Sequence, residues 1–250
     1  MANDDQTNLA VNSTTNQKNS QKRFQENPHS FLEYREVLQN YLKQGVIEFV
    51  PDSDSDSNNV TFYLPYREII RKDCPSSKPH IAFDASSHDT NSPSLISCQH
   101  IRPNLYPEIF DILLRFRLNA VAFAADMKQA FLQITLNEKD MDITKCFISN
   151  DLCDEPRPPS VYRFTRVLFS ISSSAILLSA TLKHHLKKYL EKYTNTVDFL
   201  NENIYVDDII ESRLFLYQAL TITLEVIKIF EDASISLHKG QTNSKSLHKA

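Results

Sequence analysis

The sequence predicts an α+β fold, and three observations lead to that prediction. Short apolar runs typical of strands occur among longer segments whose apolar residues recur at helical intervals. Only two glycines occur, Gly45 and Gly240, so the clustered glycines of dinucleotide-binding and P-loop folds are absent. With 250 residues, 41% of them hydrophobic and 23% charged, the chain is long enough to bury the core of one large domain or two small ones.

The N-terminal segment differs in composition from the rest of the chain. Residues 1–23 are mostly Asn, Gln, Ser, Thr and charged side chains, a composition that cannot bury enough apolar surface to offset chain entropy. They are expected to be disordered. Residues 24–240 are expected to form the folded domain, and residues 241–250 a polar end.

The first predicted elements are a helix and a strand. Apolar residues between Phe31 and Leu42 recur at helical intervals, and Gly45 is well placed to end that helix. A strand is expected at 46–50. The acidic loop at 51–59 lacks the glycine and the distal glutamate of a calcium loop, so it is interpreted as a solvated linker.

The remaining elements follow from the same patterns. Strands at 60–70 and 80–86 flank the turn-forming segment RKDCPSSKP and predict a hairpin. A short helix running into a strand is expected at 137–149. Longer helices are predicted at 106–118, 172–193 and 214–233, and further strands at 121–126 and 161–169.

The segment NIYVDDII, residues 203–210, places two adjacent carboxylates between short apolar runs. It predicts a β-hairpin with Asp207 and Asp208 at its tip. Asp126 ends the predicted strand at 121–126, and it would face Asp207 if strand and hairpin were neighbours in one sheet. Two unit charges about 4 Å apart repel by roughly 4 kcal/mol at an effective dielectric of about 20, a cost that a divalent cation removes. A solvated turn is the alternative interpretation.

Composition restricts the partners and the cellular compartment. The net charge of −4 requires that any nucleic-acid binding use a local basic face. The four cysteines lack the spacing of a zinc site or a disulfide framework, which favours a reducing, intracellular and cytoplasmic setting. No stretch of about 18 apolar residues occurs, so no contact with a membrane is expected.

Several stretches together resemble the reverse-transcriptase domain of BEL/Pao-type LTR retrotransposon polyproteins. YVDD at 205–208 is similar to the polymerase motif of reverse transcriptases. The other similar stretches, in the order of the family, are FYLP (62–65), IAFDAS (81–86), the run from PSL to LLRFR (93–117), ADMKQAFLQI (125–134) and VYRFTRVLF (161–169). The resemblance extends from about residue 24 to about residue 244.

This resemblance implies the fingers and palm of a right-hand polymerase, with a ferredoxin-like antiparallel sheet backed by helices and a thumb that is absent or vestigial. It implies addition of deoxynucleotides to a primer 3′-hydroxyl with two Mg²⁺ ions, or Mn²⁺ in their place. The implied partners are an RNA or DNA template-primer, deoxynucleoside triphosphates and other parts of a retrotransposon polyprotein.

The resemblance also implies roles for single residues. Asp126, Asp207 and Asp208 would be the catalytic, metal-binding carboxylates. Phe131 would close the sugar pocket, and Lys239 would lie near the incoming phosphates. The alternatives without a functional role are a core aromatic for Phe131 and a solvated side chain for Lys239. Tyr205 would also be a substrate-binding residue. Its alternative role is that of an ordinary half-buried aromatic in a strand.

The chain departs from the family pattern at several positions. His80 stands where the family has an arginine, and a neutral imidazole lacks the planar fork that grips phosphate. Phe169 and Ser170 stand where the family has Phe-Gly near the base pair, and Gly240 stands where it has tryptophan. These departures favour the alternative of a catalytically silent remnant that binds nucleic acid or a protein partner.

Candidate phosphate contacts are basic side chains in two groups. They are Arg115, Arg117, Arg163 and Arg166, and the run Lys183, His184, His185, Lys187 and Lys188 on the helix predicted at 172–193. The alternative for that run is a solvated helix face.

Overall fold

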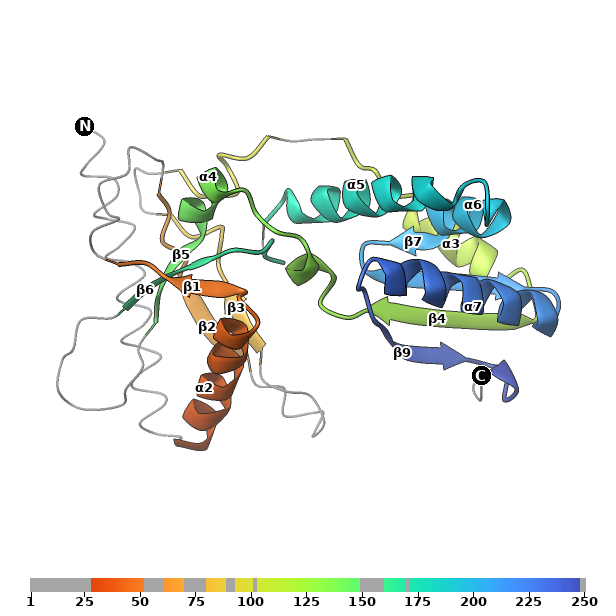
Figure 1. Cartoon of the computed structure of the whole chain (residues 1–250), viewed down its shortest axis with the longest axis horizontal. Helices are drawn as coiled ribbons and strands as arrows, with labels where there is room; N and C mark the ends of the chain where they lie inside the picture. The colour runs from red at the N-terminus through yellow and green to blue at the C-terminus, as the bar shows by residue number, and fades with distance from the viewer. Residues whose placement is uncertain are drawn as a thin grey trace. The chain divides into compact units, whose positions relative to one another are not determined.

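The computed structural model describes residues 28–51, 61–69, 80–88, 93–100, 103–148, 160–169 and 171–247. The chain divides into two compact units, the first made of residues 1–100 and 135–172 and the second of residues 101–134 and 173–250 (Figure 1). Each unit combines antiparallel strands with helices, so the predicted α+β class is confirmed. The predicted tail at 1–23 and most of the acidic loop lie outside the described residues.

The first unit contains two small sheets. The three-stranded sheet has the order β1-β6-β5 and the two-stranded sheet pairs β2 with β3, all antiparallel. The elements are α2 (Pro28–Lys43), β1 (Ile47–Phe49), β2 (Tyr66–Ile69), β3 (His80–Phe83), α4 (Glu138–Met141), the 3-10 helix η3 (Asp142–Thr144), β5 (Lys145–Ile148) and β6 (Ser160–Phe164). The predicted hairpin at 60–70 and 80–86 is present as β2 and β3, with shorter strands.

The helix α2 ends as its sequence predicts. Gly45 follows it with a φ of +63°, the left-handed conformation that glycine adopts without steric cost. Tyr34 of α2 stacks on Tyr66 of β2 with ring centroids 5.8 Å apart, and its hydroxyl donates to that of Tyr66 at 2.6 Å. This contact joins the helix to the two-stranded sheet.

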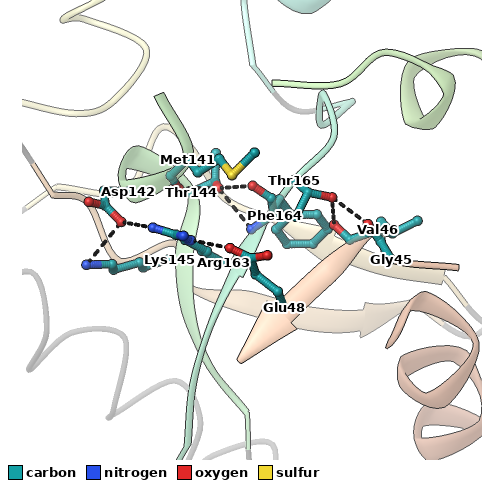
Figure 2. A network of polar contacts seen from close by, with 10 residues as sticks. All are labelled: Gly45, Val46, Glu48, Met141, Asp142, Thr144, Lys145, Arg163, Phe164 and Thr165. Atoms are coloured by element: carbon teal, nitrogen blue, oxygen red, sulfur yellow. Dashed lines mark hydrogen bonds and ion pairs between the residues drawn. The ribbon is translucent and has the colours of Figure 1, made fainter. Parts of the chain in front are cut away.

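A polar network that is buried at Asp142 and Lys145 holds β1, η3, β5 and β6 together (Figure 2). Asp142 Oδ1 lies 3.3 Å from Lys145 Nζ and accepts a hydrogen bond from Arg163 Nη1 at 3.0 Å. Arg163 Nε donates to Glu48 at 2.7 Å. The side chains of Asp142 and Lys145 are only 5% and 4% exposed, so the pairing of these charges offsets their loss of water.

The second unit is a four-stranded antiparallel sheet with the order β7-β8-β4-β9 and its associated helices. The elements are α3 (Ile109–Phe116), β4 (Val121–Met127), the 3-10 helix η2 (Ala130–Gln133), α5 (Ser174–Leu186), the 3-10 helix η4 (Lys187–Tyr189), α6 (Thr194–Asn203), β7 (Ile204–Tyr205), β8 (Asp208–Arg213), α7 (Leu216–Asp232) and β9 (Leu237–Thr242). Helices α3, α6 and α7 all pack against β8. The core includes the fully buried Ile112, Met127, Leu178, Leu200, Ile209, Ile229 and Phe230.

An α-helix and a strand of this unit were not predicted. The helix expected at 172–193 ends at Leu186, and a separate helix, α6, begins at Thr194. The segment after α7, for which no strand was predicted, forms β9, which pairs with β4. Within the described part of the chain, no helix combines the length and the apolar character that crossing a bilayer requires.

Candidate functional site

Two paired strands bring the predicted aspartates together. In the register of β4 with β8, Asp126 lies directly opposite Asp208. Residues directly opposite each other in an antiparallel pair project to the same face, so the two carboxylates share one face of the sheet. The expected partner was Asp207; that residue instead sits in the turn, where its carbonyl accepts a hydrogen bond from the Met127 N–H at 2.8 Å.

The turn that carries Asp207 is strained. Val206 and Asp207 form a two-residue loop between Tyr205 and Asp208, which pair with each other. Val206 has a φ of 58°, the sign that a type II′ turn requires at its first central position and that glycine usually supplies. A β-branched residue in this region costs roughly 1–3 kcal/mol. The sheet holds the loop in this conformation and thereby fixes Asp207 at the hairpin tip.

Electrostatics also link the three carboxylates. Burial raises the pKa of Asp207, and the nearby negative charge of Asp126 raises it further. Burial also raises the pKa of Asp208, and the charges of Asp207 and Asp126 act in the same direction. The hairpin and the end of β4 therefore concentrate negative charge that the surrounding cations compensate incompletely.

Two basic side chains from β9 contact Asp126. Lys239 Nζ donates to Asp126 Oδ2 at 3.1 Å. His238 Nδ1 lies 3.1 Å from the backbone carbonyl of Asp126 and 3.5 Å from its Oδ1. His238 was not predicted as a site residue; of the residues of β9, only Lys239 was, through the resemblance.

A β-bulge explains how consecutive residues of β9 reach the same carboxylate. Asp126 pairs with His238 whereas Ala124 pairs with Gln241, so two residues of β9, Lys239 and Gly240, oppose one residue of β4. Lys239 has a φ of 51°, and this turn of the backbone brings its side chain to the face on which His238 already lies.

Aromatic side chains lie beside the hairpin. The rings of Tyr205 and Tyr106 have centroids 6.2 Å apart. The Tyr106 hydroxyl donates to the carbonyl of Ala175 at 2.6 Å, and its pKa is raised by burial and by the charge of Asp207. Tyr106 was not predicted as a site residue. Phe131, in η2, is buried with 7% exposure.

The other predicted substrate-binding residues belong to the first unit. His80 begins β3, where its backbone pairs with Ile69 of β2. Phe169 is 74% exposed. Ser170 lies outside the described residues.

The donor chemistry of the three aspartates fits Mg²⁺. Among the residues that the structure describes, no group of three or more His, Cys, Asp or Glu side chains is arranged to hold a metal ion. Mg²⁺ uses one or two carboxylates and takes its other ligands from water and substrate phosphates, so it does not need such a group. A cation would also relieve the repulsion that raises the pKa values of Asp207 and Asp208.

Several of the basic side chains predicted to contact phosphate form hydrogen bonds within the protein instead. Arg163 belongs to the network of Figure 2, and Arg166 Nη1 donates to Thr135. Arg115 donates to Asn203 and to the carbonyl of Glu202.

The basic residues of α5 and η4 also differ in whether their side chains are engaged within the protein. His185 is buried, with its Nε2 2.8 Å from the carbonyl of Ile229, and Lys183 donates to the carbonyl of Leu105. Arg117, His184, Lys187 and Lys188 are exposed.

The chain was compared with known proteins. No protein-family model and no curated protein matches it. Solved structures of foamy virus protease-reverse transcriptase do match. One, in complex with double-stranded DNA, has a TM-score of 0.60 at 18% identity over 82% of this chain and 30% of that chain. The native prototype foamy virus protein has a TM-score of 0.60 at 17% identity over 84% of this chain and 24% of that chain.

A third match is the foamy viral protein in complex with an RNA/DNA hybrid, with a TM-score of 0.58 at 17% identity over 82% of this chain and 23% of that chain. The present chain therefore has a reverse-transcriptase-like fold, which confirms that part of the resemblance found in the sequence. It spans less than a third of the length of these three proteins.

Proposed function

We propose that this chain is a reverse-transcriptase domain of the BEL/Pao type, which adds deoxynucleotides to a primer 3′-hydroxyl on an RNA or DNA template. The observation that carries the proposal is the pairing of Asp126 with Asp208 beside a turn that presents Asp207. The reverse-transcriptase-like fold and the ordered sequence stretches support it further.

The three aspartates would hold the metal. Two Mg²⁺ ions, when bound, would supply activation of the primer hydroxyl and stabilisation of the leaving pyrophosphate. The protein contributes the position of the carboxylates: Asp126 and Asp208 are fixed by strand pairing and Asp207 by the strained turn. Positioning and charge neutralisation account for most of the catalysis in reactions of this type.

Lys239 is suited to respond to substrate. Its side chain is 68% exposed, and an ion pair of this kind contributes at most about 1 kcal/mol. The triphosphate of an incoming deoxynucleotide carries more negative charge than Asp126. We therefore expect Lys239 to exchange the carboxylate for a phosphate oxygen when the nucleotide enters.

The proposed partner is a template-primer duplex. Foamy viral protease-reverse transcriptase has been solved in complex with double-stranded DNA and with an RNA/DNA hybrid. In this chain the exposed side chains Arg117, Lys187 and Lys188 are the candidate phosphate contacts in the second unit. If they bind phosphates, affinity for the duplex falls steeply as salt is raised.

Primer extension tests the proposal. The full chain, supplied with Mg²⁺ or Mn²⁺, deoxynucleotides and a primed RNA template, is expected to extend the primer. Asp207→Asn keeps the shape of the side chain but removes its charge, so extension should fall by at least about a hundredfold. Asp111→Asn makes the same change at an exposed position of α3 and should leave extension unchanged.

A second candidate function is a catalytically silent domain that binds nucleic acid. It is favoured by His80 in place of an arginine and by the contact of Lys239 with an oxygen of Asp126 that a metal would need. This candidate predicts that the folded wild-type chain retains a labelled template-primer in a gel-shift assay but does not extend it with either metal. That pair of results would reject the polymerase proposal.

A further inference from the structure

The hairpin formed by β7 and β8 is paired with the rest of the sheet through β8 only. Its first strand, β7, consists of Ile204 and Tyr205 and lies at the edge of the sheet. In the part of the chain that the structure describes, β8 is the strand that pairs with it. A two-residue edge strand that leads into a strained turn is held by few hydrogen bonds. Contacts on its outer side therefore decide how firmly Asp207 is positioned.

Tyr106 supplies such a contact. Its ring lies beside that of Tyr205, with centroids 6.2 Å apart and ring planes inclined by 54°. Its hydroxyl donates to the carbonyl of Ala175, in the first turn of α5, at 2.6 Å. One side chain therefore connects the last residue of β7 before the turn with the start of a 13-residue helix.

Residues 104–107 form a short strap between α5 and β7. The N–H of Tyr106 donates to the side-chain oxygen of Asn104 at 3.0 Å, which fixes the backbone of the strap. Lys183 of α5 donates to the carbonyl of Leu105 at 2.7 Å, so a second hydrogen bond ties the strap to the same helix. Three residues of the strap also line one small void together with residues of α5, α6 and β7. The strap is thus a firm support from which Tyr106 reaches the hairpin.

Electrostatics preserve the hydrogen bond that anchors Tyr106. Burial raises the pKa of its hydroxyl, and the negative charge of Asp207 raises it further. Both effects keep the phenol neutral, so its proton remains available to the carbonyl of Ala175. The anchor therefore persists beside the carboxylates of the hairpin.

We propose that Tyr106 is a positioning residue of the proposed polymerase site, which anchors the hairpin of β7 and β8 to α5 and so holds Asp207 in place to bind a metal ion. Tyr106 does not itself bind the metal, because its hydroxyl donates to Ala175 of α5. The role in metal binding rests on the proposed function, whereas the anchoring of the hairpin does not. Groups that orient metal ligands in this way commonly have a large effect on metal affinity.

Two variants test the anchor. Tyr106→Phe keeps the ring but removes the hydrogen bond to Ala175, and Tyr106→Leu removes both contacts. Hydrogen exchange of the metal-free full chain should be faster at residues 204–209, by about fivefold in Tyr106→Phe and by more in Tyr106→Leu. Tyr189→Phe is the matched control, because it also removes a tyrosine hydrogen bond in the same unit, to Asp232 at 2.5 Å. It should leave exchange at 204–209 unchanged.

Binding of Mn²⁺ tests the consequence for the site. The electron paramagnetic resonance signal of the free ion measures binding without nucleotide or primer, so this measurement is independent of primer extension. The wild type is expected to bind Mn²⁺, and Tyr106→Phe should bind it about tenfold more weakly because Asp207 is held less firmly. Tyr189→Phe should bind Mn²⁺ as the wild type does. Thermal unfolding of each variant verifies that it is folded.

The outcomes that overturn the inference differ from those that overturn the proposed function. Unchanged exchange of the hairpin in the folded Tyr106 variants would show that Tyr106 does not anchor it. Unchanged Mn²⁺ affinity in a variant whose hairpin exchanges faster would show that Tyr106 stabilises the fold without positioning the site. If the wild type binds no Mn²⁺, the role in metal binding is wrong, and primer extension by the wild type then decides whether the proposed function fails as well.

Discussion

The pKa values of partly buried acidic side chains are shifted in opposite directions in the two units of this molecule. In the first unit, burial alone would raise the pKa of Asp142, but its hydrogen bond from Arg163 and the charge of Lys145 together hold it below the ordinary value. In the second unit, burial and neighbouring carboxylates raise the pKa values of Asp207 and Asp208.

This difference separates a structural role from a functional one. The charges around Asp142 satisfy one another and join strands, so they have little left to offer a ligand. The carboxylates of the second unit lack sufficient positive charge, and groups in that condition are concentrated at functional sites. The comparison thus places the candidate chemistry of this chain in the second unit.

The largest expected effect comes from breaking the compensated network of the first unit. Asp142→Asn leaves Lys145 buried without a counter-charge, so the free energy of unfolding should fall by about 3–5 kcal/mol. Urea denaturation followed by circular dichroism measures it. Asp140→Asn, at an exposed position of α4, should change stability by no more than about 0.5 kcal/mol. Equal effects of the two substitutions would show that the network does not stabilise the unit.

A somewhat smaller effect is expected from the undercompensated Glu211 of the second unit. Burial raises its pKa to about 7 in the folded chain, against an ordinary value of 4.5, and outweighs the opposing charge of Arg213. Because the folded state then binds the proton more tightly than the unfolded state, its stabilising contribution is present below pH 4.5 and is lost as the pH rises through about 7. The loss should amount to about 3 kcal/mol.

Urea denaturation at a series of pH values from about 4 to 8 measures this contribution, with Glu211→Gln as the reference. The wild type should lose stability relative to the variant as the pH rises, because glutamine does not titrate. If the two stability curves remain parallel across this range, the buried carboxyl does not have the raised pKa on which this prediction rests.

The smallest expected effect concerns the strained hairpin turn. Val206→Gly should raise the free energy of unfolding by up to about 1 kcal/mol, because relief of the positive φ exceeds the added entropy of a glycine in the unfolded chain. Ser234→Gly is a matched comparison, since Ser234 has a φ of 57° but no branched side chain. Ser234→Gly should stabilise less. A Val206 variant that is no more stable than the wild type would contradict the assignment of strain to this turn.

Local patterns predicted most of the elements. Short apolar runs indicated β4 and the β7-β8 hairpin, and helical periodicity indicated α2, α3 and α7, with boundaries that differ by a few residues. The helix α6 was missed because TNTVDFLNEN is rich in Asn and Thr, which favour helices weakly. Its helix forms because Val197, Phe199 and Leu200 are buried in the core, which is a tertiary effect.

The strand β9 is a second element that its local sequence does not indicate. Its sequence, LHKGQT, is polar and contains a glycine, so nothing local indicates a strand. Hydrogen bonds to β4 create it, and its bulge brings Lys239 and His238 to Asp126. Only the resemblance to reverse transcriptases pointed to Lys239, and no local signal pointed to His238 or Tyr106.

The sequence by itself determined that a carboxylate ends one buried strand and that two more stand at the tip of a hairpin, because short apolar runs and turn chemistry act over a few neighbouring residues. Only the tertiary structure decided that Asp208 is the residue opposite Asp126, that Asp207 lies in a strained turn, and that Glu211 is buried beside a cavity. Those outcomes depend on the pairing and packing of segments far apart in the chain, which no local pattern encodes.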